Sequence, residues 1–148
     1  MVGMDNGLLD HPLVSSELVT YAARLVRVVG RQASGDSAAS LRLLSQLDEL
    51  GPSTVTDLAK ADRTSQPTVS AALRALEESG HVSREAHPDD ARSTLVSLTD
   101  EGRAALARAR GRYGEVLDAL IEERRVDPAE VARAIHVLRT LTDQPTTS

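Results

Sequence analysis

Two short helical segments joined by a tight polar turn are the feature that most constrains how this chain can fold. The first segment, residues 55–61, begins after Thr54, whose hydroxyl can cap a helix. The turn is formed by residues 62–64, and the second helix begins after the capping residue Ser65, with Pro67 in its first turn. The apolar residues of the second helix recur every three or four positions: Val69, Leu73 and Leu76. We therefore expect two short helices that pack against each other through this stripe.

A hairpin pattern follows the second helix, which ends at Gly80. Residues 82–86 and 94–98 are strand candidates, and the polar residues 87–93 between them predict a long, charged loop. A helix at 38–50 precedes the two short ones and carries leucines on one side: Leu43, Leu44, Leu47 and Leu50. This order of elements predicts a winged helix-turn-helix, a mainly α fold with a small β-hairpin wing.

Longer helices are expected on both sides of this unit. One covers about residues 14–31 and carries the apolar stripe Leu18, Tyr21, Leu25 and Val28. Another begins after the cap Thr99 and runs to about Arg125. A last helix begins at Asp127 and carries the apolar stripe Val131, Ile135, Leu138 and Leu141. The stripes of the first and last helices need a covering surface, which is the other helix, a second copy of the chain, or both.

The order of elements predicts three parts of one intertwined domain. These are an N-terminal helical part (1–36), the winged unit (37–98) and the C-terminal helices (99–148). Residues 1–12 predict a loose lead-in, and residues 143–148 predict a polar tail.

The composition excludes several kinds of function. The chain of 148 residues has no Cys, which excludes disulfides, cysteine-ligated zinc and a thiol-based switch. Phe and Trp are absent, so we do not expect single-stranded bases to stack on aromatic side chains. The sequence has no catalytic serine elbow and no glycine-rich phosphate loop, and its four His lack metal-ligand spacing. We therefore expect neither an enzyme nor a protein that holds a metal or a cofactor.

Hydropathy and charge limit the partners of the chain. No apolar run approaches the ~20 residues of a membrane helix, and the first residues lack a secretory-signal pattern, so we expect a cytoplasmic protein. The net charge is −5, with sixteen Arg and one Lys, and this opposes nucleic-acid binding unless arginines cluster locally. A winged-helix dimer that binds proteins, without sequence-specific DNA binding, is therefore the alternative to a DNA reader.

The second short helix presents a polar face opposite its apolar stripe. The major groove of DNA is ~12 Å wide and admits one helix, which a crossing helix can hold in place. Four residues of the polar face are candidates for contacts with base edges or phosphates: Gln66, Thr68, Ser70 and Arg74. Ser65 is a further candidate, although Ser65 and Thr68 can equally serve only as helix caps. Arg74 can equally be a solvated cation beside Glu77 or Glu78.

The start of the first short helix is a second candidate contact with DNA. Free backbone N–H groups at a helix N-terminus can bind a phosphate. The residues at this place are Ser53, Thr54 and Thr56.

Two stretches carry a family resemblance, TVTDLAKADRTSQPTVSAALRALEESGHVSRE and DARSTLVSLTDEG. The first is similar to the supporting and recognition helices of the MarR family of bacterial transcriptional regulators, and the second fits the wing pattern of that family. The residues that match the wing pattern are Asp90, Arg92, Leu98 and Thr99. The order of the surrounding helices is similar too, so the likeness covers nearly the whole chain.

The resemblance implies a homodimer in which the N- and C-terminal helices of two chains interlock as dimerisation helices. The two winged units then bind double-stranded DNA at a pseudo-palindromic site. Arg92 is implied to enter the minor groove from the wing tip, with its guanidinium oriented by a bidentate pair with Asp90. These two residues can instead only hold the loop together, and Ala91 leaves the tip less charged than in relatives with a cation there. Arg84 resembles a position close to the DNA backbone, or is a charge at a strand edge.

The resemblance also implies a ligand-responsive repressor. A small aromatic or lipophilic effector would change the spacing of the two winged units and so lower the affinity for DNA. The expected effector site is a crevice between the dimerisation helices and the winged unit, and the sequence does not identify the residues that line it. Tyr21 and Tyr113 are the two aromatic side chains of the sequence that could stack on such a ligand.

Overall fold

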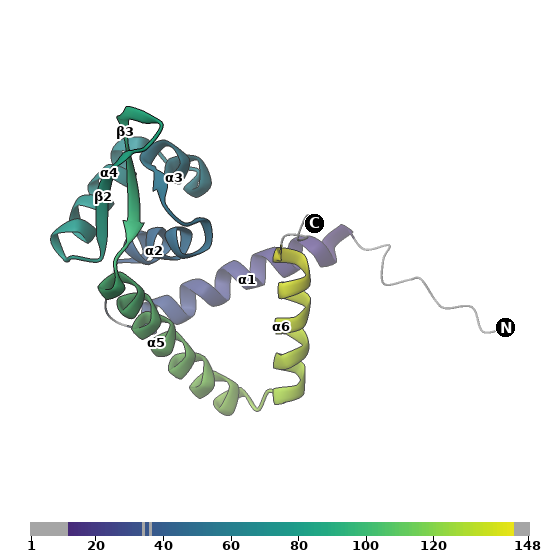
Figure 1. The fold of residues 1–148 in the computed structure, drawn as a ribbon. Helices are drawn as coiled ribbons and strands as arrows, with labels where there is room; N and C mark the ends of the chain where they lie inside the picture. Colours follow the sequence, from purple (N-terminus) through teal and green to yellow (C-terminus); the bar gives the residue numbers. More distant parts are fainter. Residues whose placement is uncertain (1–11, 34, 36, 144–148) are drawn as a thin grey trace. The chain divides into compact units, whose positions relative to one another are not determined.

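A computed structural model describes residues 12–33, 35 and 37–143 of the chain (Figure 1). Residues 1–11 of the expected lead-in and 144–148 of the expected tail lie outside the described residues. The chain divides into two compact units, one that ends at Tyr113 and one that begins at Gly114. Among the described helices, none is long and apolar enough to cross a membrane.

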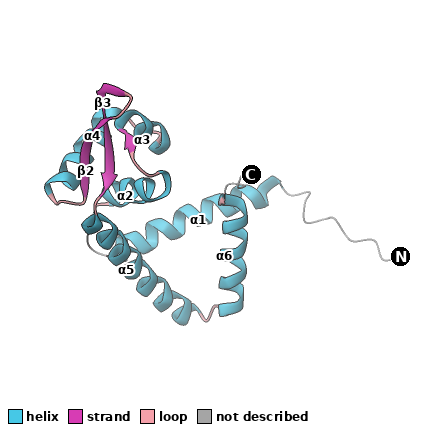
Figure 2. Ribbon diagram, viewed as in Figure 1, coloured by secondary structure: helices cyan, strands magenta, loops and turns pink. Residues whose placement is uncertain are grey.

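The described elements confirm a mainly helical fold with a small antiparallel sheet (Figure 2). In chain order they are α1 (Pro12–Gln32), α2 (Ala38–Leu50), β1 (Ser53–Thr54), α3 (Val55–Asp62), α4 (Gln66–Glu78), β2 (Val82–His87), β3 (Asp90–Leu98), α5 (Asp100–Arg124) and α6 (Pro128–Thr142). Elements α2 to β3 form the winged unit, which we call the reader.

The two short helices begin and end where the sequence indicates. The Thr54 side chain accepts a hydrogen bond from the Asp57 N–H at 3.1 Å, and the Ser65 side chain accepts one from the Thr68 N–H at 3.3 Å. Between these helices, Arg63 adopts the left-handed conformation with φ 50°, which ends α3 and redirects the chain into α4. Local capping chemistry therefore fixes the helix-turn-helix.

The wing differs from the sequence-based prediction in two ways. The expected long loop at 87–93 is wrong, because β2 and β3 extend through most of it and leave only Pro88 and Asp89 between them. A register shift next to His87 places extra residues on β3, as in a β-bulge. The sheet also has a third strand, β1, which pairs antiparallel with β3 and gives the order β1-β3-β2. A two-residue strand has too little periodicity to be found in a sequence.

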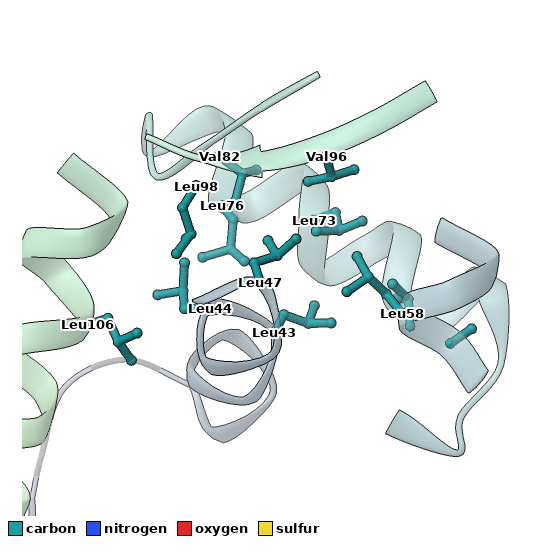
Figure 3. Close-up of a cluster of buried hydrophobic side chains, with 12 residues drawn as sticks. Leu43, Leu44, Leu47, Leu58, Leu73, Leu76, Val82, Val96, Leu98 and Leu106 are labelled. Atoms are coloured by element: carbon teal, nitrogen blue, oxygen red, sulfur yellow. The ribbon is translucent and has the colours of Figure 1, made fainter. Parts of the chain in front are cut away.

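The core of the reader lies between α2, α4 and the sheet (Figure 3). Leu58, Leu73 and Val96 have no exposed surface, and Leu106 of α5 joins the same cluster. The α2 leucines behave as expected except for the last one. Leu50, which the sequence groups with this stripe, is 58% exposed at the helix end.

The junction between the sheet and α5 explains why Thr99 and Gly102 stand where they do. The Thr99 hydroxyl donates to the Gly80 carbonyl at 2.6 Å and accepts from the Gly102 N–H at 3.0 Å. A Cβ atom at position 102 would overlap the carbonyl oxygen of His81, so only glycine fits there. These contacts fix the direction in which α5 leaves the reader.

The two outer apolar stripes are not covered by the described chain. On α1, Val29 is buried, but Leu18, Tyr21 and Leu25 are between 43% and 58% exposed. On α6 no residue is buried, and Leu141 is 67% exposed.

Candidate nucleic-acid interface

Helix α4 has one face in the core and one face in solvent. Val69, Leu73 and Leu76 are between 0% and 3% exposed and pack in the core of the reader. The opposite face carries a row of exposed residues at helical spacing: Pro67, Ala71, Arg74 and Glu78. A helix held along one side and exposed along the other can enter the major groove of DNA.

The expected contact residues of α4 divide between the exposed row and its flanks. Arg74 is in the exposed row, and among the described residues no ion pair involves it. This is compatible both with a contact to phosphate and with a solvated cation beside Glu77 or Glu78. Ser70 is half-buried on the flank. Gln66 and Thr68 are exposed at the start of the helix.

Side chains at the start of α4 also tie it to α3. The Gln66 amide donates to the Thr56 hydroxyl at 3.4 Å, and the Ser65 and Thr68 hydroxyls lie 2.7 Å apart. These hydrogen bonds hold the side chains in place, although the side chains are exposed. Their capping roles and contacts with DNA are compatible, because each hydroxyl can make more than one hydrogen bond.

Ser53 and Thr54 lie deeper than the sequence suggests. The Ser53 side chain is 6% exposed, sits in β1 and donates to the Gly51 carbonyl at 2.9 Å. Thr54 is half-buried and already engaged in capping α3. Of these three candidates, Thr56 is the exposed one. Ser53 therefore has a structural role in the strand, which two residues of sequence could not reveal.

Arg92 is exposed on β3 near the wing tip. The predicted bidentate pair with Asp90 is not formed, because the Asp90 carboxylate instead accepts the backbone N–H of Arg92 at 3.0 Å. On the other side of the tip, the Asp89 N–H donates to Nδ1 of His87 at 3.1 Å. Asp90 thus shapes the backbone of the tip and leaves the Arg92 guanidinium free of ion pairs with the described residues.

Two ion pairs change the local charge of the reader. Arg84 lies 3.0 Å from Glu77, so its guanidinium is partly engaged by a carboxylate of α4. Asp62 lies 3.0 Å from Arg42. Two of the carboxylates that oppose DNA binding are therefore matched by cations.

Within the reader, the exposed cations without an ion pair to the described residues lie on α3, the turn after it, α4 and the wing. These are Lys60, Arg63, Arg74 and Arg92. The sequence reasoning did not select Lys60, Arg63, Pro67 or Ala71. The spacing of Pro67, Ala71 and Arg74 on one helical row is a signal that could have found the last two.

A pocket of about 660 Å³ lies between α1, α2 and the part of α5 that belongs to the same unit. Its lining residues are Val26, Arg27, Gly30, Arg31, Ala38, Leu41, Arg42, Ser45, Gln46, Glu49 and Tyr113. This volume is typical of small-molecule sites. Of the two tyrosines considered, Tyr113 lines the pocket and Tyr21 does not. No group of three potential metal ligands occurs among the described residues.

Comparison with known proteins identifies the family. A sequence model of the MarR family matches residues 37–94, and YxaD, a helix-turn-helix-type transcriptional regulator of Bacillus subtilis, is 30% identical over 113 residues, covering 75% of this chain and 79% of YxaD. A solved structure from Pseudomonas aeruginosa, described as a transcriptional regulator, is 30% identical with a TM-score of 0.71, covering 88% of this chain and 91% of that one.

BpsR of Bordetella bronchiseptica, whose DNA binding is regulated by 6-hydroxynicotinic acid, is also similar. It is 25% identical with a TM-score of 0.60, covering 88% of this chain and 99% of BpsR. These relatives are regulators and not enzymes, and the segment that matches the family model contains the helix-turn-helix and the wing as far as residue 94. This chain therefore belongs to the MarR family of transcriptional regulators.

Proposed function

We propose that this regulator is a homodimeric repressor that binds a pseudo-palindromic operator in the cytoplasm and releases it when a small organic effector binds. Two α4 helices would occupy successive major grooves about one helical turn, ~34 Å, apart. The two wings would reach the flanking minor grooves.

The outward row of α4 carries this proposal. Arg74 lies where a long cation can reach phosphate, while Gln66 and Thr68 stand at the helix end with hydrogen-bonding groups for base edges. Pro67 and Ala71 add small apolar groups that can contact a thymine methyl. The row and the exposed start of the helix together offer the three kinds of contact that a base-reading helix uses.

Cations around α4 supply the local positive charge that the net charge of −5 lacks. Arg63 precedes α4, Arg92 is on the wing and Arg84 is at the sheet edge. We assign Arg92 to the minor groove, and Thr54, Thr56 and Arg84 to the phosphate backbone. Ser53 contributes only through the strand that supports them.

The exposed stripes of α1 and α6 support a dimer. Contiguous exposed apolar surface on a protein of this size is typical of an interaction surface. Leu18 and Leu25 on α1, and Ile135 and Leu138 on α6, are between 42% and 47% exposed. A second copy that covers them would place the two readers on one duplex.

The pocket supports a small effector. Its wall is formed by α1 and α2, so a ligand would contact a dimerisation helix and the reader at once. The regulation of BpsR by 6-hydroxynicotinic acid provides a precedent among similar proteins. A ligand changes DNA affinity only if it prefers one arrangement of these elements over the other.

A gel shift with the DNA upstream of the gene tests the proposal. We expect saturable binding at ~100 mM salt that weakens steeply as salt rises, because cations on the protein displace counterions from phosphates. A promoter–reporter assay then separates repression from activation. The net acidic charge favours the alternative, a protein-binding winged-helix dimer, and the absence of any shift at ~100 mM salt would support that alternative.

A further inference from the structure

We propose that Pro67 and Ala71 make α4 select its operator by the 5-methyl group of pyrimidines in the major groove. At the base pairs that these residues contact, thymine and 5-methylcytosine would be accepted, and uracil and unmethylated cytosine would bind less tightly. This inference rests on the proposed function, since it names the chemical group by which the reader selects its operator.

The backbone alone fixes where these two apolar groups lie. Pro67 and Ala71 are exposed and lie one helical turn apart. The opposite face of α4 is buried in the core and carries Val69, Leu73 and Leu76. The proline ring is bonded to the backbone at both ends, and neither proline nor alanine has side-chain rotamers to choose between. Both groups therefore face away from the core of the reader, whatever the neighbouring side chains do.

The charges along the same row indicate which half of α4 enters the groove. Arg74 follows the two apolar residues, and Glu78 comes one turn after Arg74. The N-terminal end of a helix is electropositive and attracts phosphates, whereas the C-terminal end and a carboxylate there are repelled by them. We therefore expect the N-terminal half of α4, with Pro67 and Ala71, to come nearest to the base edges.

Pro67 and Ala71 can distinguish bases by shape but not by hydrogen bonding. Neither side chain has a donor or an acceptor, and proline has no backbone N–H. In the major groove, thymine presents a methyl group at C5 beside the acceptor O4, whereas cytosine presents an N4 amino group. Apolar contact removes the methyl group from water and takes no account of the group at C4. A methylated cytosine therefore makes the same contact as thymine.

The polar side chains beside this pair are ordered differently. The Gln66 amide donates to the Thr56 hydroxyl at 3.4 Å, and the Ser65 and Thr68 hydroxyls lie 2.7 Å apart. These groups can still bond to bases, but fixing a long side chain such as Gln66 on a base costs rotational freedom. Proline and alanine have no such freedom to lose, so a methyl contact retains its full contribution.

The spacing of the pair predicts the spacing of the methyl groups. Four residues of an α-helix span about 6 Å along its axis, and successive base pairs are ~3.4 Å apart. If both residues contact methyl groups, the two methylated pyrimidines of a half-site should lie within about two base-pair steps of each other. The symmetry of the proposed dimer repeats this arrangement in the other half-site.

A methyl scan tests the proposal with the full-length protein and an operator selected from random-sequence DNA. Each thymine is replaced, in both half-sites at once, by uracil, or with its adenine by a cytosine–guanine or 5-methylcytosine–guanine pair. Anisotropy at ~100 mM salt measures each affinity. For at least one thymine of each half-site, we expect uracil to lower affinity about fourfold per methyl group, or about fifteenfold in total. At that position 5-methylcytosine should bind more tightly than cytosine by about the same factor.

Two variants identify the residue that makes the contact. Ala71→Gly removes a methyl group, and Pro67→Ala removes most of a ring. In at least one of them, the thymine and uracil operators should bind equally well at a position where the wild type distinguishes them. A weaker α4 helix in Ala71→Gly lowers both affinities alike, so the ratio between the two DNAs isolates the contact.

Ala75→Gly is the matched control for the variants. Ala75 is also exposed on α4, but it lies one turn nearer the C-terminal end than Ala71 does. The same loss of a methyl group and of helix propensity should there leave the preference for thymine over uracil as in the wild type.

The proposal is overturned if no thymine of the operator depends on its methyl group, or if both variants keep the wild-type preference for thymine. It is also overturned if 5-methylcytosine binds no better than cytosine at the methyl-dependent positions. A protein that selects an operator but ignores its methyl groups would retain the proposed function and lose only this inference. A wild-type protein that selects no sequence from the random DNA would contradict both.

Discussion

The reader and the outer helices use similar apolar residues to opposite effect. In the reader, Leu58 and Leu73 are completely buried, and α2, α4 and the sheet share one core. On α1, Val19 is 70% exposed, and on α6, Leu141 is 67% exposed. The reader therefore buries its apolar residues within one chain, whereas α1 and α6 leave large apolar side chains exposed.

This contrast separates two requirements of a DNA-binding regulator. The shape that enters the groove is set within one chain, by capping residues such as Ser65 and by a local core. The spacing of two such shapes on one duplex depends on the outer helices of the proposed dimer.

Deletion of residues 126–148 should have the largest effect. It removes α6 and with it one of the two exposed stripes that we assign to the dimer. We expect a monomeric or aggregated chain, with operator affinity lower by at least ~100-fold because two linked readers no longer bind together. Size-exclusion chromatography with light scattering gives the mass, and anisotropy gives the affinity.

Deletion of residues 144–148 alone is the control, because α6 ends at Thr142. It should retain the dimer and the affinity. A fully active dimer after the longer deletion would show that the interface lies elsewhere. The exposed apolar side chains of α6 would then have no role in dimer formation.

Leu73→Ala tests the claim that the reader has its own core. A cavity at this fully buried site should lower the free energy of unfolding by about 2–5 kcal/mol. Leu50→Ala is the matched control, since Leu50 is 58% exposed and should change the stability by less than about 0.5 kcal/mol. Urea unfolding at one fixed protein concentration compares the two, because dimer formation makes stability depend on concentration. If both variants lost the same free energy of unfolding, burial within one chain would not explain the stability of the reader.

Elements that depend on local chemistry could be predicted from the sequence. Thr54, Ser65 and Thr99 cap helices as expected, because a hydroxyl and the N–H groups it accepts from are neighbours in the chain. The core stripe of α4 is likewise confirmed, since apolar residues spaced three to four apart lie on one face of a helix wherever the helix packs.

Features that depend on distant contacts could not be predicted. The strand at Ser53 exists only through its pairing with Val96, and the exposure of Leu50 depends on which other elements reach the end of α2. The pairing of Asp62 with Arg42 joins residues twenty positions apart. The pocket shares this origin, because its walls come from α1, α2 and α5.

Arg92→Ala should weaken operator binding by about 1–3 kcal/mol while the dimer stays intact. The loss arises from one cation in the minor groove of each half-site, and Arg92 makes no ion pair with the described residues that its removal would disturb. Arg124→Ala, which removes an exposed arginine at the end of α5, is the control and should bind as the wild type does. Unchanged affinity in Arg92→Ala would contradict the role of the wing and would limit the reader to α4.

Substitutions of Arg84 and Glu77 should have the smallest effect. They test whether this surface ion pair contributes to the stability of the reader or to its affinity for DNA. The two side chains are 27% and 45% exposed, so breaking the pair should lower the free energy of unfolding by only about 0.2–1 kcal/mol in either variant. The two variants should differ on DNA. Arg84→Gln removes a cation from the backbone contact, and Glu77→Gln frees it, so affinity should fall a few-fold in the first and rise in the second. Equal affinities in anisotropy at ~100 mM salt would make this arginine a purely internal partner of α4.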